Sequence, residues 1–587
     1  MRSVLACAVV AGILLAACSS SRSTTTAGGQ LPTTAGESSE TSGETSPGTA
    51  DDATPEADAE DAADEAPENS ADAETADDSG ALRCPAATAP DTGEPFEDRT
   101  ADLGLESALI GMRGHSTGVG DVDDDGYVDV FVGSFADRPV EDYQERGADG
   151  PAPDRLLLGS ADGFTLDETF PGELARTSGA AFADLDGDAD LDLVIARNPR
   201  ADEERGRAPT VVLENDGGRF EIVTELDAER GARSIGVLDF DADGLLDLFV
   251  VEDRFTNGRS ALFRNVGGFE FEDVTEAAGL PTDLAGLGVA AVDLTRDTRP
   301  DLFVAGDNRL FVNDDGHFEE VDGPFAWESF GDEDDPAGVA AADVNADGWI
   351  DLVVGQHYNS TLDFDRLVPV RLYLNGGLDG DGAPAFEDAT EAVGLAGLPT
   401  KAPHVELTDI DGDSDVDIVT TASADEGARP AVMINEGGDL PRFTMPDGLG
   451  AAQYWIAGAV LDADSDGGPE ILLVEWEPAL GTRVVEGPEQ RGDWVRVGVG
   501  PTGGAGVGAV VEAYEAGAAG SEDALIAAVP ITASVGFGSG SEPAALIGIG
   551  DREAVDVRVI MPNGGERIEI PGVEAGERVV VDAPACP

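Results

Sequence analysis

The chain of 587 residues carries 119 Asp and Glu against 34 Lys and Arg, which gives a formal net charge of −85. This balance excludes a nucleic-acid partner and electrostatic docking on anionic lipid, because both require a surplus of Lys and Arg. The acidic side chains must instead be solvated, lie in disordered segments or be neutralised by bound cations.

Residues 1–17 have the pattern of a lipoprotein signal peptide. Arg2 precedes an apolar run from Val4 to Leu15, which is too short to span a bilayer. The Leu-Ala-Ala-Cys sequence that ends at Cys18 resembles the bacterial lipobox. This resemblance implies that Cys18 is acylated, and that the protein is exported and lipid-anchored on the outer side of the bacterial cell membrane or envelope. A simple signal peptide or a mitochondrial leader is the alternative.

Residues 18–83 predict a disordered acidic tether. Between residues 19 and 83 the chain has sixteen Asp and Glu but no aromatic residue, no Val and no Ile. Such a segment cannot bury enough apolar surface to offset the entropy cost of ordering it. Its like charges also favour an extended chain.

Cys84 and Cys586 bracket the rest of the chain. In an exported protein, a cysteine pair at the two ends of a fold is a candidate disulfide, because a fold that joins its own ends brings them together. Two unrelated thiols are the alternative.

One Asp-rich unit recurs seven times between these cysteines. In the first six units a short Gly/Ala-rich run precedes the Asp cluster, two apolar runs follow the cluster, and a segment containing Phe comes last. Four strand-like segments at a mean period of about 57 residues are the signature of a β-propeller. The clusters begin at Asp121, Asp184, Asp239, Asp293, Asp343, Asp409 and Asp462.

The two ends of the repeat array predict a closed ring. A Phe segment precedes the first Asp cluster, while the seventh unit lacks one, so the first segment can complete the last blade and remove an exposed sheet edge. We therefore predict an all-β fold: a seven-bladed β-propeller over residues 84–490, then a small β-rich C-terminal domain over residues 491–587. The seven Phe residues are Phe96, Phe164, Phe220, Phe271, Phe318, Phe386 and Phe443.

The spacing D-x-D-x-D-G-x-x-D within the clusters predicts metal-binding hairpin loops. In the first loop Asp121, Asp123 and Asp125 can converge only if the backbone curls, and Gly126 permits the left-handed conformation that this requires. The carboxylate of Asp129 and a backbone carbonyl would complete an oxygen cage of the kind that suits Ca²⁺. The predicted ligands of the other loops are Asp184, Asp186, Asp188, Asp192, Asp239, Asp241, Asp243, Asp247, Asp343, Asn345, Asp347, Asp351, Asp409, Asp411, Asp413, Asp417, Asp462, Asp464, Asp466 and Glu470.

The seven loops do not match this pattern equally well. Ala189 and Ser414 stand where Gly is expected. The loop at Asp293 has lost the pattern, since Thr295 replaces an acid and Arg296 adds a positive charge. We predict that this loop is empty, and that about five or six Ca²⁺ ions bind in all.

The repeats resemble the FG-GAP/VCBS repeats of integrin α-subunit propellers. The region from about Gly492 to Asp582, with stretches such as "DWVRVGVGPTGGAGVGAVVEAY", looks like the ASPIC/UnbV domain. The pairing of the two is similar to the cartilage acidic protein family and its bacterial relatives. This resemblance implies calcium sites on one face of the propeller, and it implies no catalytic residues.

Two connections between second and third strands are expanded, at Phe135–Asp154 and Gln356–Pro369. Because strand direction alternates, we expect both on the face opposite the Asp loops. The second contains a candidate ligand-contact group, although ordinary variable loops are the alternative. That group is His357, Tyr358, Phe364 and Arg366. The four His residues of the chain (His115, His317, His357 and His404) lack metal-ligand spacing, so we expect them in surface or packing roles.

These observations favour a non-catalytic, calcium-binding cell-surface lipoprotein whose propeller is a scaffold for adhesion or for binding a protein or glycan. Its membrane contact would be the N-terminal lipid anchor alone. An extracytoplasmic enzyme, hydrolase-like and with its site in the central channel or under the two expanded connections, is the alternative. An assembly scaffold without a small-molecule ligand is a third possibility. No nucleophile–base pair stands apart from the loop carboxylates, so the sequence favours binding.

Overall fold

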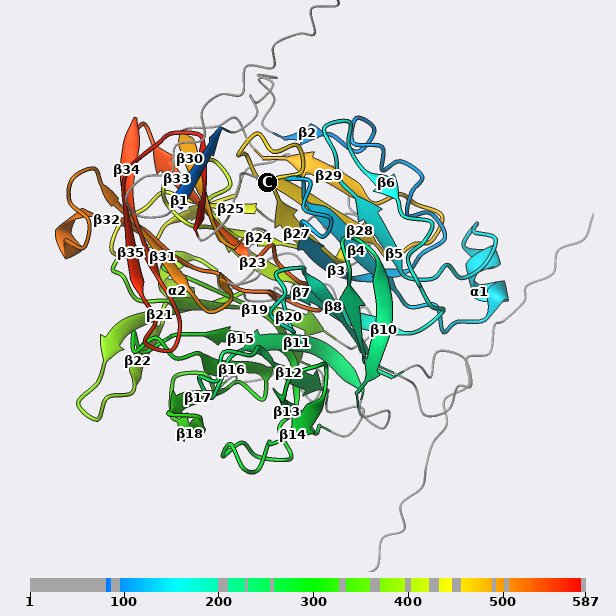
Figure 1. The fold of residues 1–587 in the computed structure, drawn as a ribbon, viewed down its shortest axis with the longest axis horizontal. Coiled ribbons are helices and arrows are strands. Elements are labelled where there is room, and N and C mark those ends of the chain that lie inside the picture. The colour runs from blue at the N-terminus through cyan, green and yellow to red at the C-terminus, as the bar shows by residue number, and fades with distance from the viewer. Residues whose placement is uncertain are drawn as a thin grey trace, which may run out of the picture. The chain divides into compact units, whose positions relative to one another are not determined.

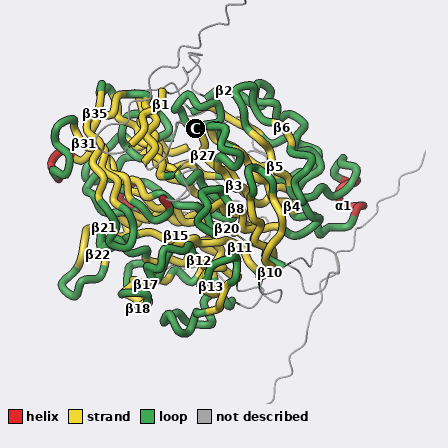
Figure 2. The backbone as a smooth tube through the Cα atoms, viewed as in Figure 1, coloured by secondary structure: helices red, strands yellow, loops and turns green. Residues whose placement is uncertain are grey.

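The computed structural model describes residues 81–85, 96–198, 209–226, 231–253, 258–326, 334–358, 370–395, 403–421, 432–445, 455–487, 492–500 and 506–581. Nearly all regular structure in them is strand (Figure 2). The helices are short: α1 (Val140–Glu145), α2 (Thr390–Val393) and the 3-10 helix η2 (Glu522–Ala524). Within these residues no helix is long and apolar enough to cross a membrane. The predicted all-β fold is confirmed.

The seven predicted units form seven four-stranded antiparallel sheets in the described residues. Blade 1 is β3 (Gly114–Gly120), β4 (Asp129–Ser134), β5 (Arg155–Leu158) and β6 (Thr165–Leu166); blade 2 is β7 (Thr177–Ala183), β8 (Asp192–Arg197), β9 (Val211–Asn215) and β10 (Phe220–Glu225). Blade 3 is β11 (Ala232–Leu238), β12 (Asp247–Glu252), β13 (Ala261–Asn265) and β14 (Phe271–Asp273); blade 4 is β15 (Gly286–Val292), β16 (Asp301–Gly306), β17 (Arg309–Asp314) and β18 (His317–Val321). Blade 5 is β19 (Asp334–Ala342), β20 (Asp351–Tyr358), β21 (Arg371–Leu378) and β22 (Pro384–Asp388); blade 6 is β23 (Val405–Thr408), β24 (Asp417–Thr420), β25 (Val432–Asn435) and β26 (Phe443–Thr444).

Blade 7 closes the ring with a strand from the other end of the repeat array. It consists of β27 (Trp455–Leu461), β28 (Glu470–Glu475) and β29 (Arg483–Glu486), and its fourth strand is β2 (Glu97–Asp98), which pairs with β29. The first strands of the blades contact one another in the order β3, β7, β11, β15, β19, β23, β27 and back to β3 (Figure 1). The closure predicted from Phe96 is therefore confirmed.

Five blades are linked to their predecessors by an Asn at or near the end of the third strand. In blade 5, Asn375 Nδ2 donates to the backbone oxygen of Leu294 in blade 4 (3.0 Å) and to that of Ile350 in its own blade (3.3 Å). The backbone N–H of Asn375 donates to Asp351 Oδ1 (2.7 Å). The equivalent residues Asn215, Asn265, Asn313 and Asn435 make the same three bonds.

The C-terminal domain consists of two further four-stranded sheets. One has the order β1 (Ala81–Pro85), β36 (Glu577–Val581), β30 (Asp493–Val499) and β33 (Ala544–Gly550). The other has the order β32 (Leu525–Pro530), β31 (Val510–Glu515), β34 (Ala554–Ile560) and β35 (Arg567–Glu574). Their facing Val, Ile and Ala side chains form one buried core.

The first described strand belongs to this domain rather than to a blade. The backbone of Cys84 lies in β1 and pairs with Arg578 of β36, so the first and last described strands are neighbours. The Cys84 side chain and Cys586 lie outside the described residues, so their disulfide stays a prediction. Cys18, the signal peptide and residues 18–80 of the predicted tether lie outside them too, whereas residues 81–83, which we assigned to the tether, are part of β1.

The loop between β32 and β33, residues 531–543, enters the channel of the propeller; we call it the plug loop. Phe537 at its tip is 2% exposed, and Gly536 and Gly538 beside it have positive φ of 61° and 66°, which permits the tight turn. Phe537 packs in a buried cluster with Leu287, Ala337 and Ile456. The backbone N–H groups of the loop bond to three blades through Gly536 N to Val339 O (2.8 Å), Gly540 N to Thr117 O (2.8 Å) and Gly538 N to Ser234 Oγ (3.2 Å).

The Asn links give a test of inter-blade stability. Replacing Asn375 by Ala leaves two buried carbonyls without a donor, so we expect the free energy of unfolding to fall by about 1–3 kcal/mol. Urea unfolding followed by circular dichroism measures the change. Glu272→Ala, an exposed change in β14, is the control and should alter stability little; an equally small effect of Asn375→Ala would contradict the proposed link.

Candidate metal centre

The acid at the ninth position closes each Asp loop. In blade 1 the backbone N–H of Val122 donates to Asp129 Oδ2 (2.7 Å), and that of Gly159 donates to Asp129 Oδ1 (2.7 Å). The first oxygen joins the two ends of the loop, and the second joins the loop to the third strand. The bond from the second loop position recurs in the other six loops, to Asp192, Asp247, Asp301, Asp351, Asp417 and Glu470.

The acid at the first position holds the curl of the loop. Asp121 accepts the backbone N–H groups of Asp125 (3.2 Å) and Gly126 (2.9 Å). The sixth residue is left-handed even where it is not Gly, with φ of 79° at Ala189 and 82° at Ser414. The absence of Gly therefore did not change the conformation, although a side chain costs about 1–2 kcal/mol in this region.

In five loops the acids at positions one, three and nine converge. One carboxylate oxygen from each lies within 4.8 Å of the others. The groups are Asp121, Asp123 and Asp129; Asp184, Asp186 and Asp192; Asp239, Asp241 and Asp247; Asp409, Asp411 and Asp417; and Asp462, Asp464 and Glu470. The fifth-position acids that we also predicted as ligands, Asp125, Asp188, Asp243, Asp413 and Asp466, lie outside these groups. In blade 5 the third position is Asn345, between Asp343 and Asp351 in the same pattern.

The donor set fits a hard cation. Four oxygens at first or third loop positions are buried and accept no hydrogen bond within the described part of the chain: Asp241 Oδ1, Asn345 Oδ1, Asp462 Oδ1 and Asp464 Oδ1. Buried oxygens of this kind are costly unless a donor or a cation faces them. Carboxylate and amide oxygens, with no nitrogen or sulfur, suit Ca²⁺ better than zinc or copper.

Burial changes the protonation of the loop acids. Desolvation raises the pKa of Asp129, Asp192 and Asp247 to about 8, and repulsion from the neighbouring carboxylates adds to it. The same causes raise the pKa of Asp409 to about 8. A divalent cation in the loop would favour the ionised forms and offset both effects.

Arginine side chains enter two of the loops. In blade 3, Arg264 contacts Asp241 through Nε (2.8 Å) and Asp243 through Nη2 (2.8 Å). In blade 7, Arg99 contacts Asp464 (3.2 Å). A cation bound in either loop would share the third-position carboxylate with a guanidinium, so these two loops attract a cation less strongly than their spacing suggests.

The loop at Asp293 keeps its shape without the acid triad. Its second and ninth positions are bonded as in the other loops, and Asp293 accepts the N–H groups of Asp297 (3.2 Å) and Thr298 (2.7 Å). Asp297 is paired with Arg299 (2.8 Å). Our expectation that this loop is empty stays a prediction.

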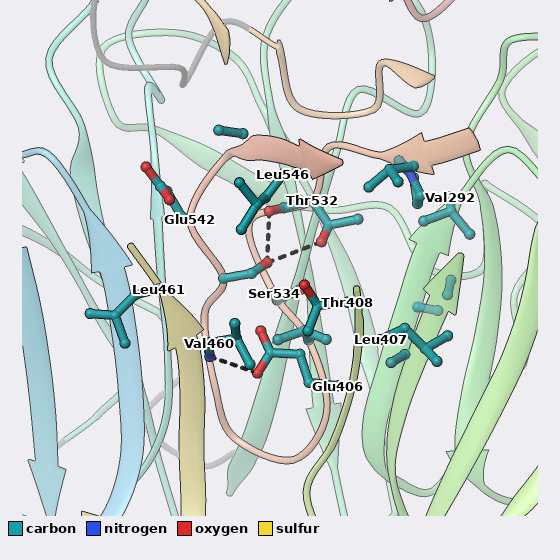
Figure 3. Close-up of a pocket in the computed structure, with 18 of the residues that line it drawn as sticks. Val292, Glu406, Leu407, Thr408, Val460, Leu461, Thr532, Ser534, Glu542 and Leu546 are labelled. Atoms are coloured by element: carbon teal, nitrogen blue, oxygen red, sulfur yellow. Dashed lines mark hydrogen bonds between the residues drawn. The ribbon is translucent and has the colours of Figure 1, made fainter. Parts of the chain in front are cut away.

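A cavity of about 100 Å³ lies where the first strands of blades 4 to 7 face the plug loop (Figure 3). Glu406 lines it, and its Oε2 accepts the N–H of Val460 (3.0 Å) and contacts His404 Nε2 (3.2 Å). His404 Nδ1 in turn accepts the N–H of Phe537 (3.3 Å), so His404 is a packing residue against the plug loop. The alternative enzyme site in the channel would have to share this space with the plug loop.

The expanded connection of blade 1 forms α1 on the side opposite the Asp loop. It begins where β4 ends, beside the start of β3, and the hydroxyl of the buried Tyr143 donates to Phe135 O (2.6 Å). The contact group predicted in blade 5 lies outside the residues whose side chains are described.

The linking Asn residues, Arg264, Arg99 and the plug loop were not predicted from the sequence. The linking Asn residues end the segments "VVLEN", "ALFRN" and "VMIN", and an Asn at the end of an apolar segment is also typical of a turn. The feature that could have identified them is that Asn recurs at the end of the third strand-like segment in five units. No local signal marks Arg264, Arg99 or the plug loop, because their partners lie in other segments.

Together, the fold and the loops define a β-propeller built of FG-GAP-like repeats. The FG-GAP-like repeat matches residues 239–304 and 299–354. Cartilage acidic protein 1 of Homo sapiens is 26% identical over 420 residues, covering 66% of this chain and 60% of the relative. Its counterpart in Xenopus tropicalis is 25% identical over 361 residues, covering 54% and 52%. The chain thus spans little more than half the length of these relatives.

Similarity to solved structures is more distant. The exotype rhamnogalacturonan lyase YesX aligns with a TM-score of 0.37 and 13% identity, covering 70% of this chain and 76% of that chain. The resemblance of the C-terminal domain to ASPIC/UnbV stays a prediction.

The raised pKa values predict how chelated protein responds to pH. A carboxyl whose folded pKa lies near 8 binds its proton more tightly when folded, so its stabilising contribution is complete below about pH 4 and is lost as pH rises through about 8. We expect the Tm of protein in EDTA to fall from pH 5 to pH 8, and that of calcium-loaded protein to fall less. Calorimetric melts at both pH values test this; parallel pH profiles with and without calcium would contradict it.

Proposed function

We propose that this protein is a non-catalytic, calcium-binding cell-surface lipoprotein whose propeller is a scaffold for adhesion or for binding a protein or glycan. The observation that carries the calcium assignment is the convergence of three acids in each of five loops. The buried loop oxygens without a hydrogen-bond donor add to it. The FG-GAP-like repeats and the similarity to cartilage acidic protein 1 support a binding scaffold.

The channel supports binding over catalysis. Phe537 fills its centre, and the cavity that remains is small and partly lined by the plug loop. An enzyme would need an open site for its substrate. We therefore place the partner outside the channel, on a face or rim that the C-terminal domain leaves free.

The blade 1 connection is the described element best suited to such contacts. It lies opposite the Asp loops and is held by Arg113 to Asp142 (2.6 Å) and by Arg146 to Glu477 (2.6 Å). These ion pairs attach α1 to blades 1 and 7 and so limit the movement of the surface that it presents. The lipid anchor at Cys18 would hold this surface outside the cell, beyond the tether.

Calcium removal tests the proposal. A site whose free ion is at 100 times its Kd stabilises the folded state by about 2.7 kcal/mol, and several sites add. We expect EDTA to lower the Tm markedly and added Ca²⁺ to restore it, with titration calorimetry giving about five or six ions per chain. An unchanged Tm on chelation and on restoring Ca²⁺ would refute calcium binding.

A single substitution can separate metal binding from folding. Asp123 is exposed and its carboxylate accepts the backbone N–H of Asp125, whereas Asp121 and Asp129 make the bonds that close the loop, so Asp123→Ala should remove one calcium ion and lower the Tm in EDTA only slightly. Asp297→Ala, in the loop without a triad, should leave the calcium count as it is. Titration calorimetry measures the number of calcium ions that each variant binds. Loss of an ion in Asp297→Ala would show that the loop at Asp293 is a site.

A further inference from the structure

The C-terminal domain rests on the face of the propeller that carries the Asp loops. It touches the loops through their backbone atoms, in five blades. The contacts are Arg578 Nη1 to Gly126 O (3.1 Å), Asn563 Nδ2 to Asp239 O (3.0 Å), Asn563 N to Thr298 O (2.6 Å), Asp343 N to Ala528 O (3.2 Å) and Gly550 N to Gly412 O (2.9 Å). Because these atoms belong to the curled part of each loop, the domain fits only when the loops keep their shape.

The contact is closest at blade 6. Gly548 packs against the carboxylate of Asp409, and a Cβ atom at this position would collide with Asp409 Oδ2. Asp409 is 4% exposed, and so is Asp462 in the next loop. The docked domain therefore removes Asp409 from water, which is unfavourable for a group of like charges unless a cation neutralises them. At Asp462 the domain also brings the positive charges of Arg496 and Arg578, which offset part of this cost.

Blade 4 is attached in a different way. Arg296, at the fourth position of its loop, forms an ion pair with Glu512 of β31 (3.0 Å), and Glu512 is 2% exposed. Thr298, at the sixth position, accepts Asn563 N at its carbonyl and Gly564 N at Oγ1 (2.6 Å). Arg296 and Thr298, which replace the metal-binding pattern in this loop, thus both bond to the C-terminal domain.

We propose that the metal-binding loops form a cation-dependent seat for the C-terminal domain, with the Arg296 loop as its cation-independent anchor. This rests on the calcium binding proposed above and adds what the ions control. Loss of the cations would leave buried, mutually repelling acids under the domain. The domain would then loosen and the plug loop would leave the channel, while the Arg296–Glu512 pair and the Thr298 contacts keep the domain attached.

Hydrogen exchange of the full chain can follow the plug loop directly. Its amides at Gly536, Phe537, Gly538 and Gly540 donate hydrogen bonds to the propeller, whereas those of β31 lie inside the C-terminal domain. In EDTA we expect exchange in residues 531–543 to rise roughly tenfold over the rate in Ca²⁺, with β31 unchanged. An unchanged rate in residues 531–543 would overturn the proposal, and so would an equal rise in both segments, which would indicate global unfolding.

Two arginine variants isolate the anchor. Arg296→Met removes the ion pair to Glu512, so exchange in residues 531–543 should rise further in EDTA and stay near wild type in Ca²⁺. Arg299→Met is the matched control, since Arg299 pairs with Asp297 and Asp315 inside the propeller and should change neither rate. Equal behaviour of the two variants would overturn the anchor role.

Titration calorimetry on the same sample separates this inference from the proposed function. Calcium binding without any change in exchange of residues 531–543 would overturn the seat and leave the calcium sites standing. Absence of calcium binding would overturn both.

Discussion

The ninth-position carboxylate of the Asp loop is the group on which the rest of the structure depends. In blade 1 it is Asp129, which is fully buried and receives one amide from the start of its loop and one from the third strand. Blades 1 to 6 are therefore each tied together at a carboxyl group that has been taken out of water. Two amide donors offset only part of that cost, because the other acids of the loop raise the local negative potential. The arrangement that closes the loop is thus also the one that attracts a cation.

The ninth-position carboxylate also takes part in joining neighbouring blades. The Asn at the end of the third strand donates its backbone N–H to the ninth acid of its own blade, and its side chain to the second loop residue of the previous blade, as Asn435 does with Asp417 and Val344. Loop closure and inter-blade contact therefore share one residue. Gly159 in blade 1 and Gly487 in blade 7 stand where the other blades have Asn. Between blades 7 and 1 the ring is closed by β2, which pairs with β29, and by Arg99, which pairs with Glu486.

The repeat and the loops could be predicted from the sequence because their signals are local. The Asp spacing, the Phe of the fourth strand and the glycine turns all lie within one unit, so counting them gave the blade number and the closure at Phe96. The plug loop could not be predicted, since nothing between residues 531 and 543 marks Phe537 as a residue of the channel. Arg264 shows the same limit inside a site: its position before Asn265 is visible, but its contact with Asp241 depends on how two hairpins face each other. The spacing of the acids in the sequence predicted which carboxylates could bind a metal. Only the fold shows which of these carboxylates also contact an arginine.

The loop at Asp293 shows that the shape of the loop does not depend on the third-position acid. It keeps the bonds of the first and ninth positions, and it keeps φ of 74° at Thr298, although it has lost the acid at the third position. If the third-position acid were needed to form the curl, this loop could not retain it. The hydrogen bonds of Asp293 and Asp301 are therefore sufficient for the shape, and the third-position acid is dispensable to the fold. Asp123 and Asp186 each accept one backbone N–H from two residues further on, but the loop at Asp293 keeps its curl without an acid at this position, so the charge that they add points to a ligand rather than to the shape of the loop.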